Sequence, residues 1–218
     1  LIKKNYITYA VGALIVALLK LAIIPLFTYQ LPKSEFGIIG ILWLVMPVLS
    51  CIINIGTNSS FFILFGKSDY KDRCSLVYNT FGILLANGLF IFLILYFNLD
   101  WLKYLVDNMD SRTFIMLYFV IFSSIIMNMF LGLLTFEHKA VMNILFMLLN
   151  VLLTAVFTFI LILYVQKSYG SYIKAMLIAN AIVAIIGVIY MIKNYSYRLA
   201  ILSYKITKKL IYLGTPAI

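Results

Sequence analysis

Hydrophobic residues run through this sequence in long stretches that charged side chains interrupt mainly at their ends. A membrane-spanning helix needs about 20 apolar residues to cross a hydrocarbon layer of about 30 Å. A membrane β-strand instead shows about ten residues of alternating hydrophobicity. The stretches here are continuous and too long for strands, so they predict helices. Six spans are expected, at about residues 5–29, 36–66, 74–98, 113–136, 140–166 and 173–193.

The second predicted span, residues 36–66, is longer than one straight crossing requires. Pro47 and Gly56 lie within it, and both residue types weaken a regular helix. We therefore expect this span to kink, to tilt or to project beyond the bilayer.

The segment that follows the sixth span, residues 199–213, has the pattern of an amphipathic helix. Leucine and isoleucine side chains share one helical face, and three lysines share another. These lysines are Lys205, Lys208 and Lys209. Such a helix is expected to lie on the cytoplasmic leaflet and to link the six-helix bundle of residues 1–198 to a following part. Residues 214–218 resemble the start of another helix, so the chain is expected to continue beyond this sequence.

Composition excludes a soluble enzyme and a disordered chain. Of the 218 residues, 65% are hydrophobic and 11% are charged, whereas soluble domains carry about 45–50% apolar and about 25% charged residues.

The sequence contains no phosphate-binding loop motif and no cluster of histidine and acidic residues. Its one histidine, His138, stands between Glu137 and Lys139 in a short turn that we interpret as a solvated loop. Neither an enzyme nor a metal site is expected.

The distribution of lysine and arginine predicts the orientation. Eleven of the 17 basic residues lie on the side of the N-terminus and five on the other. The positive-inside rule then places both termini in the cytoplasm. The net charge of +10 flanks the spans rather than forming one basic face, so membrane lipids are expected as partners and nucleic acid is not.

Lys20 is the one charged residue in the interior of a predicted span, with Ala13 and Ala17 on the same helical face. Ionisable residues are costly within a membrane and are functional candidates there. Lys20 either lines an internal cavity that attracts an anionic substrate or extends its ammonium group to the outer interface.

Uncharged polar residues recur at helical spacing along the second to sixth spans. These stripes include Asn54, Asn58, Asn128, Asn150 and Asn180. A polar stripe on a membrane helix faces away from lipid. The stripes either join helices through hydrogen bonds or line a hydrated cavity.

Several short segments resemble a known family. The segment Ile23–Gly37 (IIPLFTYQLPKSEFG) is similar to the start of bacterial polysaccharide transporters. These are oligosaccharidyl-lipid flippases of the O-antigen and capsule type. They belong to the multidrug/oligosaccharidyl-lipid/polysaccharide exporter superfamily. Their first helix ends in a proline-containing turn followed by an acidic residue, an aromatic residue and a glycine, as in Pro25, Glu35, Phe36 and Gly37. Further matches are Ile55–Asn58 (IGTN), Phe136–Ala140 (FEHKA) and Leu213–Pro216 (LGTP).

The resemblance implies an all-α integral membrane protein in which this chain is the N-terminal half. Two six-helix bundles would enclose a cavity and work by alternating access. The implied substrate is an undecaprenyl-diphosphate-linked oligosaccharide, moved from the cytoplasmic to the outer leaflet of a bacterial inner membrane for surface polysaccharide synthesis. The resemblance implies no cofactor. It leaves the coupling ion open between H⁺ and Na⁺, and it suggests polysaccharide assembly proteins as partners.

The resemblance also implies roles for the polar residues. Lys20 would meet the diphosphate, and Asn54, Asn58, Asn128, Asn150 and Asn180 would offer hydrogen bonds to sugars. One departure matters, because relatives often carry a basic residue in the region that here reads Phe61–Phe65 (FFILF). Lys20 would have to supply that charge.

Other functions remain open from sequence. A cation-coupled multidrug or metabolite antiporter of the same superfamily would favour carboxylates within the spans, but all seven acidic residues lie outside them. A lipid II flippase is not separated by sequence from the first interpretation. A membrane glycosyltransferase or polymerase would need a larger external loop than the predicted one at 99–112, and a purely structural subunit would not need a polar face on so many helices.

Overall fold

The computed structural model describes residues 2–97, 111–195 and 204–214. In this part of the chain the structure is helical and contains no strands, and six helices are long and apolar enough to cross a membrane. The predicted all-α membrane class is therefore confirmed. The helices are α1 (Ile2–Gln30), α2 (Lys33–Asn54), α3 (Thr57–Phe65), α4 (Tyr70–Phe97), α6 (Ser111–Phe136), α7 (Ala140–Tyr164), α8 (Tyr169–Asn194) and α9 (Tyr204–Gly214).

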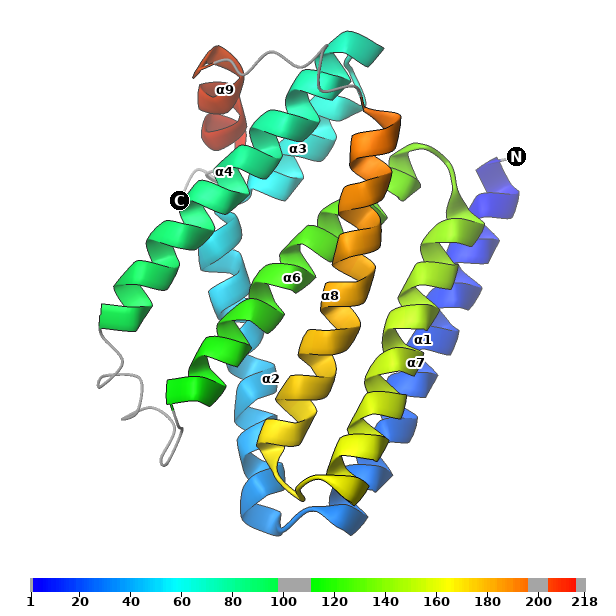
Figure 1. Ribbon diagram of the computed structural model, residues 1–218. Coiled ribbons are helices and arrows are strands. Elements are labelled where there is room, and N and C mark those ends of the chain that lie inside the picture. Colours follow the sequence, from blue (N-terminus) through cyan, green and yellow to red (C-terminus); the bar gives the residue numbers. More distant parts are fainter. Residues whose placement is uncertain (1, 98–110, 196–203, 215–218) are drawn as a thin grey trace.

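The long helices form one bundle in which α8 packs between α6 and α7 (Figure 1). Helix α1 packs along α7, and α2 contacts α4, α6 and α8. Helix α6 is the most buried of the six spans, with Met129, Phe130 and Leu133 fully enclosed. The other helices turn many large apolar side chains outward, as expected where the surrounding solvent is lipid.

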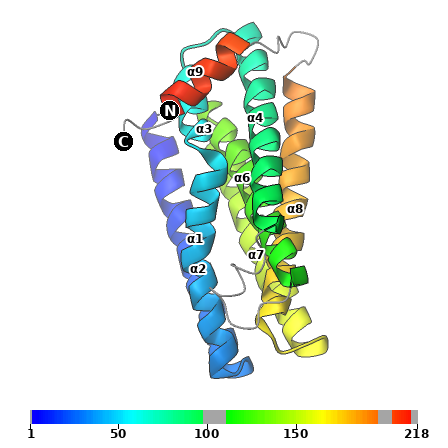
Figure 2. The same cartoon turned by 90° about the vertical axis from the view of Figure 1, so that its left-hand side faces the viewer.

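Two ends of the bundle can be distinguished. The start of α1, helix α3, the α6–α7 turn, the last turn of α8 and helix α9 lie at one end, which we call the α9 end (Figures 1 and 2). The α1–α2 and α7–α8 turns lie at the opposite end. The lysine and arginine pattern predicts that the α9 end is cytoplasmic.

The second predicted span is broken rather than continuous. Helix α2 ends at Asn54 and α3 begins at Thr57, because Ile55 (φ 42°) and Gly56 (φ 65°) adopt left-handed backbone conformations. The helix continues through Pro47, so of the two residues expected to weaken it, Gly56 marks the break. A left-handed conformation costs glycine little, because glycine has no Cβ.

Side chains satisfy the backbone groups that the break releases. Asn87 of α4 donates to the Ile53 carbonyl, and the Ser60 hydroxyl donates to the Gly56 carbonyl at 3.2 Å. The Asn58 backbone N–H donates to Asn54 Oδ1 at 3.1 Å, so Asn54 caps the start of α3.

Helix α9 packs directly on this break (Figure 2). Its Leu210 is fully buried, and Thr207 Oγ1 donates to Asn79 Oδ1 of α4 at 3.2 Å. A Cβ added to Gly56 would lie 1.8 Å from the Gly214 carbonyl oxygen, so the two backbones touch. Residues 199–203 of the predicted linker helix, residues 99–110 of the loop predicted at 99–112 and the final residues 215–218 lie outside the described residues.

Candidate functional site: a polar cavity among five helices

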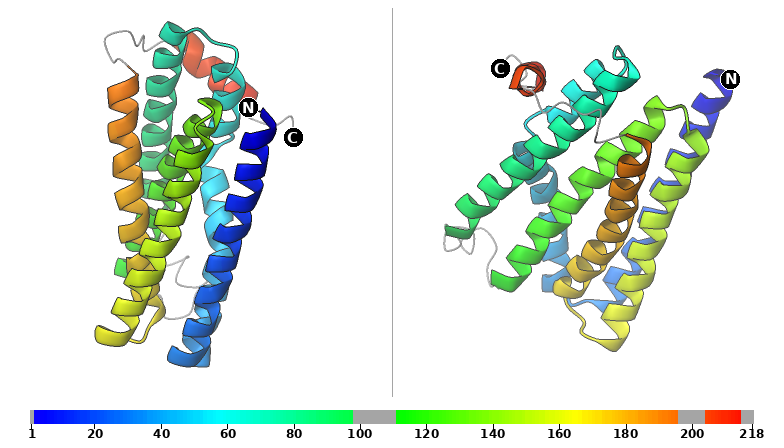
Figure 3. Two further views of the ribbon diagram at one scale, coloured as in Figure 1. Left: turned by 90° about the vertical axis from the view of Figure 1, so that its right-hand side faces the viewer. Right: turned by 45° about the horizontal axis from the view of Figure 1, so that its top comes forward.

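A cavity of about 850 Å³ lies within the bundle. Helices α1, α2, α6, α7 and α8 contribute its lining, and Figure 3 shows these helices from two further sides. The walls are mostly apolar, with polar side chains from every one of the five helices. The polar and aromatic-polar lining residues are Lys20, Trp43, Ser50, Ser124, Asn128, Asn150, Thr154, Tyr172 and Asn180.

Lys20 of α1 is the only charged side chain of the cavity lining within the described part of the chain. Its side chain is exposed, and no carboxylate among the described residues pairs with it. An ammonium group without an ionic partner attracts anions, and the attraction is stronger where less water screens the charge. The structure therefore places Lys20 at the cavity, which was one of the two positions that the sequence left open.

Asn150 and Asn180 meet across the cavity wall. Asn150 Nδ2 donates to Asn180 Oδ1 at 2.8 Å, which joins α7 to α8. Asn180 Nδ2 in turn donates to the Val120 carbonyl of α6 at 3.3 Å. Both interpretations of the polar stripes thus apply to these residues, because they join helices and also line the cavity.

Asn128 of α6 also lines the cavity, and its side chain is exposed. Within the described residues its amide makes no hydrogen bond, unlike those of Asn150 and Asn180. Its donor and acceptor atoms are therefore available to a polar ligand.

Asn54 and Asn58 lie elsewhere. They stand at the α2–α3 break near the α9 end, and neither lines the cavity. Asn54 caps α3 there, and Asn58 Oδ1 is buried without a hydrogen-bond partner. The structure thus brings together four of the six predicted site residues, namely Lys20, Asn128, Asn150 and Asn180.

Three aromatic residues, Phe27, Trp43 and Tyr172, also form part of the cavity wall, and none of them was among the predicted site residues. Trp43 Nε1 donates to the Tyr172 hydroxyl at 3.0 Å. The Phe27 ring packs edge-on against Tyr172, with centroids 4.9 Å apart. One signal could have identified Trp43, because it lies inside a predicted span rather than at a span end, where tryptophan anchors helices to the membrane interface.

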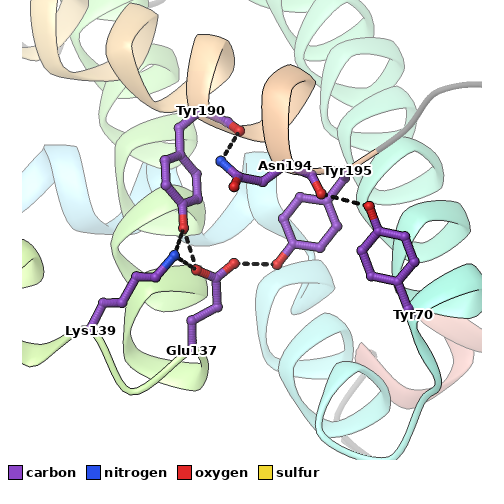
Figure 4. A network of polar contacts seen from close by, with 6 residues as sticks. All are labelled: Tyr70, Glu137, Lys139, Tyr190, Asn194 and Tyr195. Atoms are coloured by element: carbon purple, nitrogen blue, oxygen red, sulfur yellow. Dashed lines mark hydrogen bonds and ion pairs between the residues drawn. The ribbon is translucent and has the colours of Figure 1, made fainter.

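A second polar cluster lies at the α9 end, around Glu137 (Figure 4). The Lys139 ammonium lies 2.7 Å from the Glu137 carboxylate, the Tyr195 hydroxyl donates to the carboxylate at 2.5 Å, and the Tyr190 hydroxyl also donates to it. The Tyr70 hydroxyl donates to the Asn194 carbonyl at 2.9 Å. The interpretation of this turn as a solvated loop was wrong for Glu137, because its carboxylate accepts hydrogen bonds from Tyr190 and Tyr195, which are distant in sequence. It holds for His138, whose side chain is exposed.

Electrostatics keep the Glu137–Lys139 pair charged. Burial alone raises the pKa of the Glu137 carboxyl, but hydrogen bonds from Lys139, Tyr190 and Tyr195 outweigh it and hold this pKa below its ordinary value. The hydrogen bond with Glu137 raises the pKa of the Lys139 ammonium. The cluster is therefore a fixed ionic contact that ties the α6–α7 turn to the end of α8.

Comparison with known proteins supplies the family. The sequence matches, over residues 2–218, a family described as polysaccharide biosynthesis protein. The chain belongs to this family. Its members are generally transporters or flippases rather than enzymes, so this polysaccharide biosynthesis family protein is a multi-pass membrane protein with a transport function related to polysaccharides. Comparison with curated proteins and with solved structures found no match.

No group of three or more histidine, cysteine or acidic side chains that could hold a metal ion occurs within residues 2–97, 111–195 and 204–214. The cavity lining in this part of the chain also contains no histidine, cysteine or carboxylate. What the cavity offers is one ammonium group, several amides and hydroxyls, and a large apolar surface, a combination suited to an anion that carries polar and apolar parts.

Proposed function

We propose that this polysaccharide biosynthesis family protein is a flippase for undecaprenyl-diphosphate-linked oligosaccharide, which it moves from the cytoplasmic to the outer leaflet of a bacterial inner membrane. The observation that carries the proposal is the convergence of Lys20, Asn128, Asn150 and Asn180 from four helices on one cavity. The moved lipid would serve synthesis of a surface polysaccharide such as O-antigen, capsule or exopolysaccharide.

The chemistry of the cavity supports this cargo. A diphosphate carries negative charge that the Lys20 ammonium would neutralise, and charge-assisted hydrogen bonds are the strongest of their kind. Amides donate and accept hydrogen bonds, so Asn128, Asn150 and Asn180 suit the hydroxyls of sugars. The polyprenyl chain would stay in the surrounding lipid.

Alternating access needs a second bundle opposite the first. We propose that this bundle follows α9 in the complete transporter and that the half-open cavity of the first bundle faces it. A gradient of H⁺ or Na⁺ would drive the cycle.

The decisive experiment follows a fluorescent undecaprenyl-diphosphate oligosaccharide in proteoliposomes containing the complete transporter. An added glycosidase removes the fluorescent sugar only from the leaflet that faces it. The expected result is protein-dependent exposure of the sugar, reduced about tenfold or more in Lys20→Ala, because a charge-assisted hydrogen bond contributes about 1.5–3 kcal/mol.

Lys33→Ala is the matched control, because Lys33 is an exposed lysine at the start of α2 that does not line the cavity. It should leave transport unchanged, and Lys20→Arg should retain part of the activity. Absence of sugar movement in the wild type, together with proton- or sodium-coupled uptake of an organic cation, would overturn the proposal in favour of an antiporter.

A further inference from the structure

The three aromatic residues of the cavity wall differ in how far they are exposed. Phe27 and Tyr172 are almost fully buried, at 1% and 7% exposure, whereas Trp43 is 37% exposed and lines the cavity. The Trp43 ring centroid lies 6.3 Å from Phe27 and 6.5 Å from Tyr172. Trp43 therefore presents open ring surface, and the other two rings pack behind it.

One hydrogen bond sets the direction of the Trp43 indole. Its only polar group, Nε1–H, donates to the Tyr172 hydroxyl at 3.0 Å. Because this donor is already used, the exposed surface of Trp43 can offer only its π face and its edge to a ligand. Phe27 closes the packing from the side of α1, with its ring edge-on to Tyr172.

We infer that Trp43 is a platform on which a pyranose ring of the cargo stacks, with Tyr172 as the residue that positions it. This inference rests on the proposed function and names the part of the cargo that this end of the cavity recognises. The face of a pyranose carries several C–H groups with a small positive charge, and the face of an aromatic ring is negative. Such a contact needs no free hydrogen-bond donor on the aromatic side, which agrees with the paired indole.

The spacing along α1 fits a ligand with a charged part and a sugar part. Phe27 follows Lys20 by seven residues, which is about 10 Å along a helix axis. A diphosphate at Lys20 would then place the first sugars toward the aromatic rings, on the side away from the α9 end. The cavity is thus divided into a cationic end and a sugar-stacking end.

A fluorescence measurement tests the platform directly in the complete transporter. The sequence carries two tryptophans, Trp43 and Trp101, and Trp101 lies outside the described residues. In a variant with Trp101→Phe, and with any tryptophan of the other half also replaced, Trp43 reports alone. Undecaprenyl-diphosphate oligosaccharide should shift or quench the Trp43 emission, whereas undecaprenyl diphosphate without sugars should leave it nearly unchanged.

Binding of the same two lipids separates stacking from charge recognition. Trp43→Leu should weaken binding of the sugar-bearing lipid about three- to tenfold, in the range of one aromatic contact, without weakening binding of the sugar-free lipid. Lys20→Ala should weaken both. Trp43→Phe keeps an aromatic face and should retain most of the binding. Tyr172→Phe keeps the ring but removes the acceptor of the indole N–H, so it should reproduce part of the selective loss.

Phe159→Leu is the matched control, because Phe159 is an exposed aromatic residue of α7 that does not line the cavity. It should change binding of neither lipid. The inference is overturned if Trp43→Leu weakens both lipids equally or neither, or if the sugar-bearing lipid leaves the Trp43 emission unchanged while it binds and is transported. If the wild type neither binds nor transports the sugar-bearing lipid, the proposed function itself fails, and the platform fails with it.

Discussion

The side chains of Asn150 and Asn180 join α7 to α8 through one hydrogen bond of 2.8 Å between Asn150 Nδ2 and Asn180 Oδ1. Both residues also line the cavity. Polar contacts between membrane helices contribute about 0.6–2 kcal/mol each. The pair therefore has a structural contribution that can be measured separately from transport.

A double-mutant cycle should detect this contribution. We expect the single variants Asn150→Ala and Asn180→Ala and the double variant to give a coupling free energy of about 0.6–2 kcal/mol, measured by unfolding in detergent. Asn128→Ala should show no coupling to either residue, because its amide has no partner among the described residues, yet it should reduce transport. Coupling of zero between Asn150 and Asn180 would contradict the observed contact.

Gly56→Ala should disrupt the junction between the α2–α3 break and α9. The new Cβ would lie 1.8 Å from the Gly214 carbonyl oxygen, which is backbone and cannot rotate away, and φ is 65°. We expect a loss of about 1–3 kcal/mol in unfolding free energy and increased access of a protease to residues 204–214. Gly82→Ala is the control, because a Cβ at Gly82 meets no atom within 4 Å; equal protease access in both variants would show that the junction tolerates a side chain.

Glu137→Gln should lower the melting temperature near pH 7. The carboxylate accepts hydrogen bonds from Lys139, Tyr190 and Tyr195, and hydrogen bonds to a charged group contribute about 1.5–3 kcal/mol. Asp69→Asn replaces an exposed acid and should have little effect on the melting temperature measured in detergent.

The pH dependence of this cluster follows from the two pKa shifts. The pKa of Glu137 is below its ordinary value of 4.5, so its contribution is present above about that pH and is lost as pH falls through the lowered pKa. The pKa of Lys139 is above its ordinary value of 10.5, so its contribution is lost as pH rises through the raised pKa. The melting difference between wild type and Glu137→Gln should therefore persist across neutral pH and shrink below about pH 4. A constant difference down to pH 2 would contradict this assignment.

Glu35→Ala should loosen the end of the bundle opposite α9. Glu35 Oε2 accepts the backbone N–H of Tyr169 at 2.8 Å, at the first residue of α8. A carboxylate at a helix N-terminus pairs a free N–H and meets the positive end of the helix dipole. We expect Glu35→Ala to cost about 1 kcal/mol of unfolding free energy and Glu35→Gln to cost less, since the amide oxygen still accepts. Equal stability of Glu35→Ala and wild type would contradict the cap.

The membrane class could be predicted from sequence because it depends on local properties. Hydropathy and helical periodicity are set by residues within a few turns of one another, so the six candidate spans and their polar stripes were visible without any partner helix. The left-handed break was only partly predictable. Gly56 was expected to weaken the second span together with Pro47, but the break also involves a positive φ at Ile55 and a hydrogen bond from Asn87 of α4 to the Ile53 carbonyl, and neither is visible in the local sequence.

What the sequence alone determined is that a six-span, all-helical membrane chain carries polar faces and one lysine inside its first span. What only the tertiary structure decided is which of those faces meet. The rotation of each helix about its axis is set by packing against its neighbours, so Lys20, Asn128, Asn150 and Asn180 share a cavity while Asn54 and Asn58 stand at a helix break. For the same reason Trp43 bonds to Tyr172, although 129 residues separate them in the sequence. Glu137 likewise accepts a hydrogen bond from Tyr195, which the sequence of its own turn could not predict.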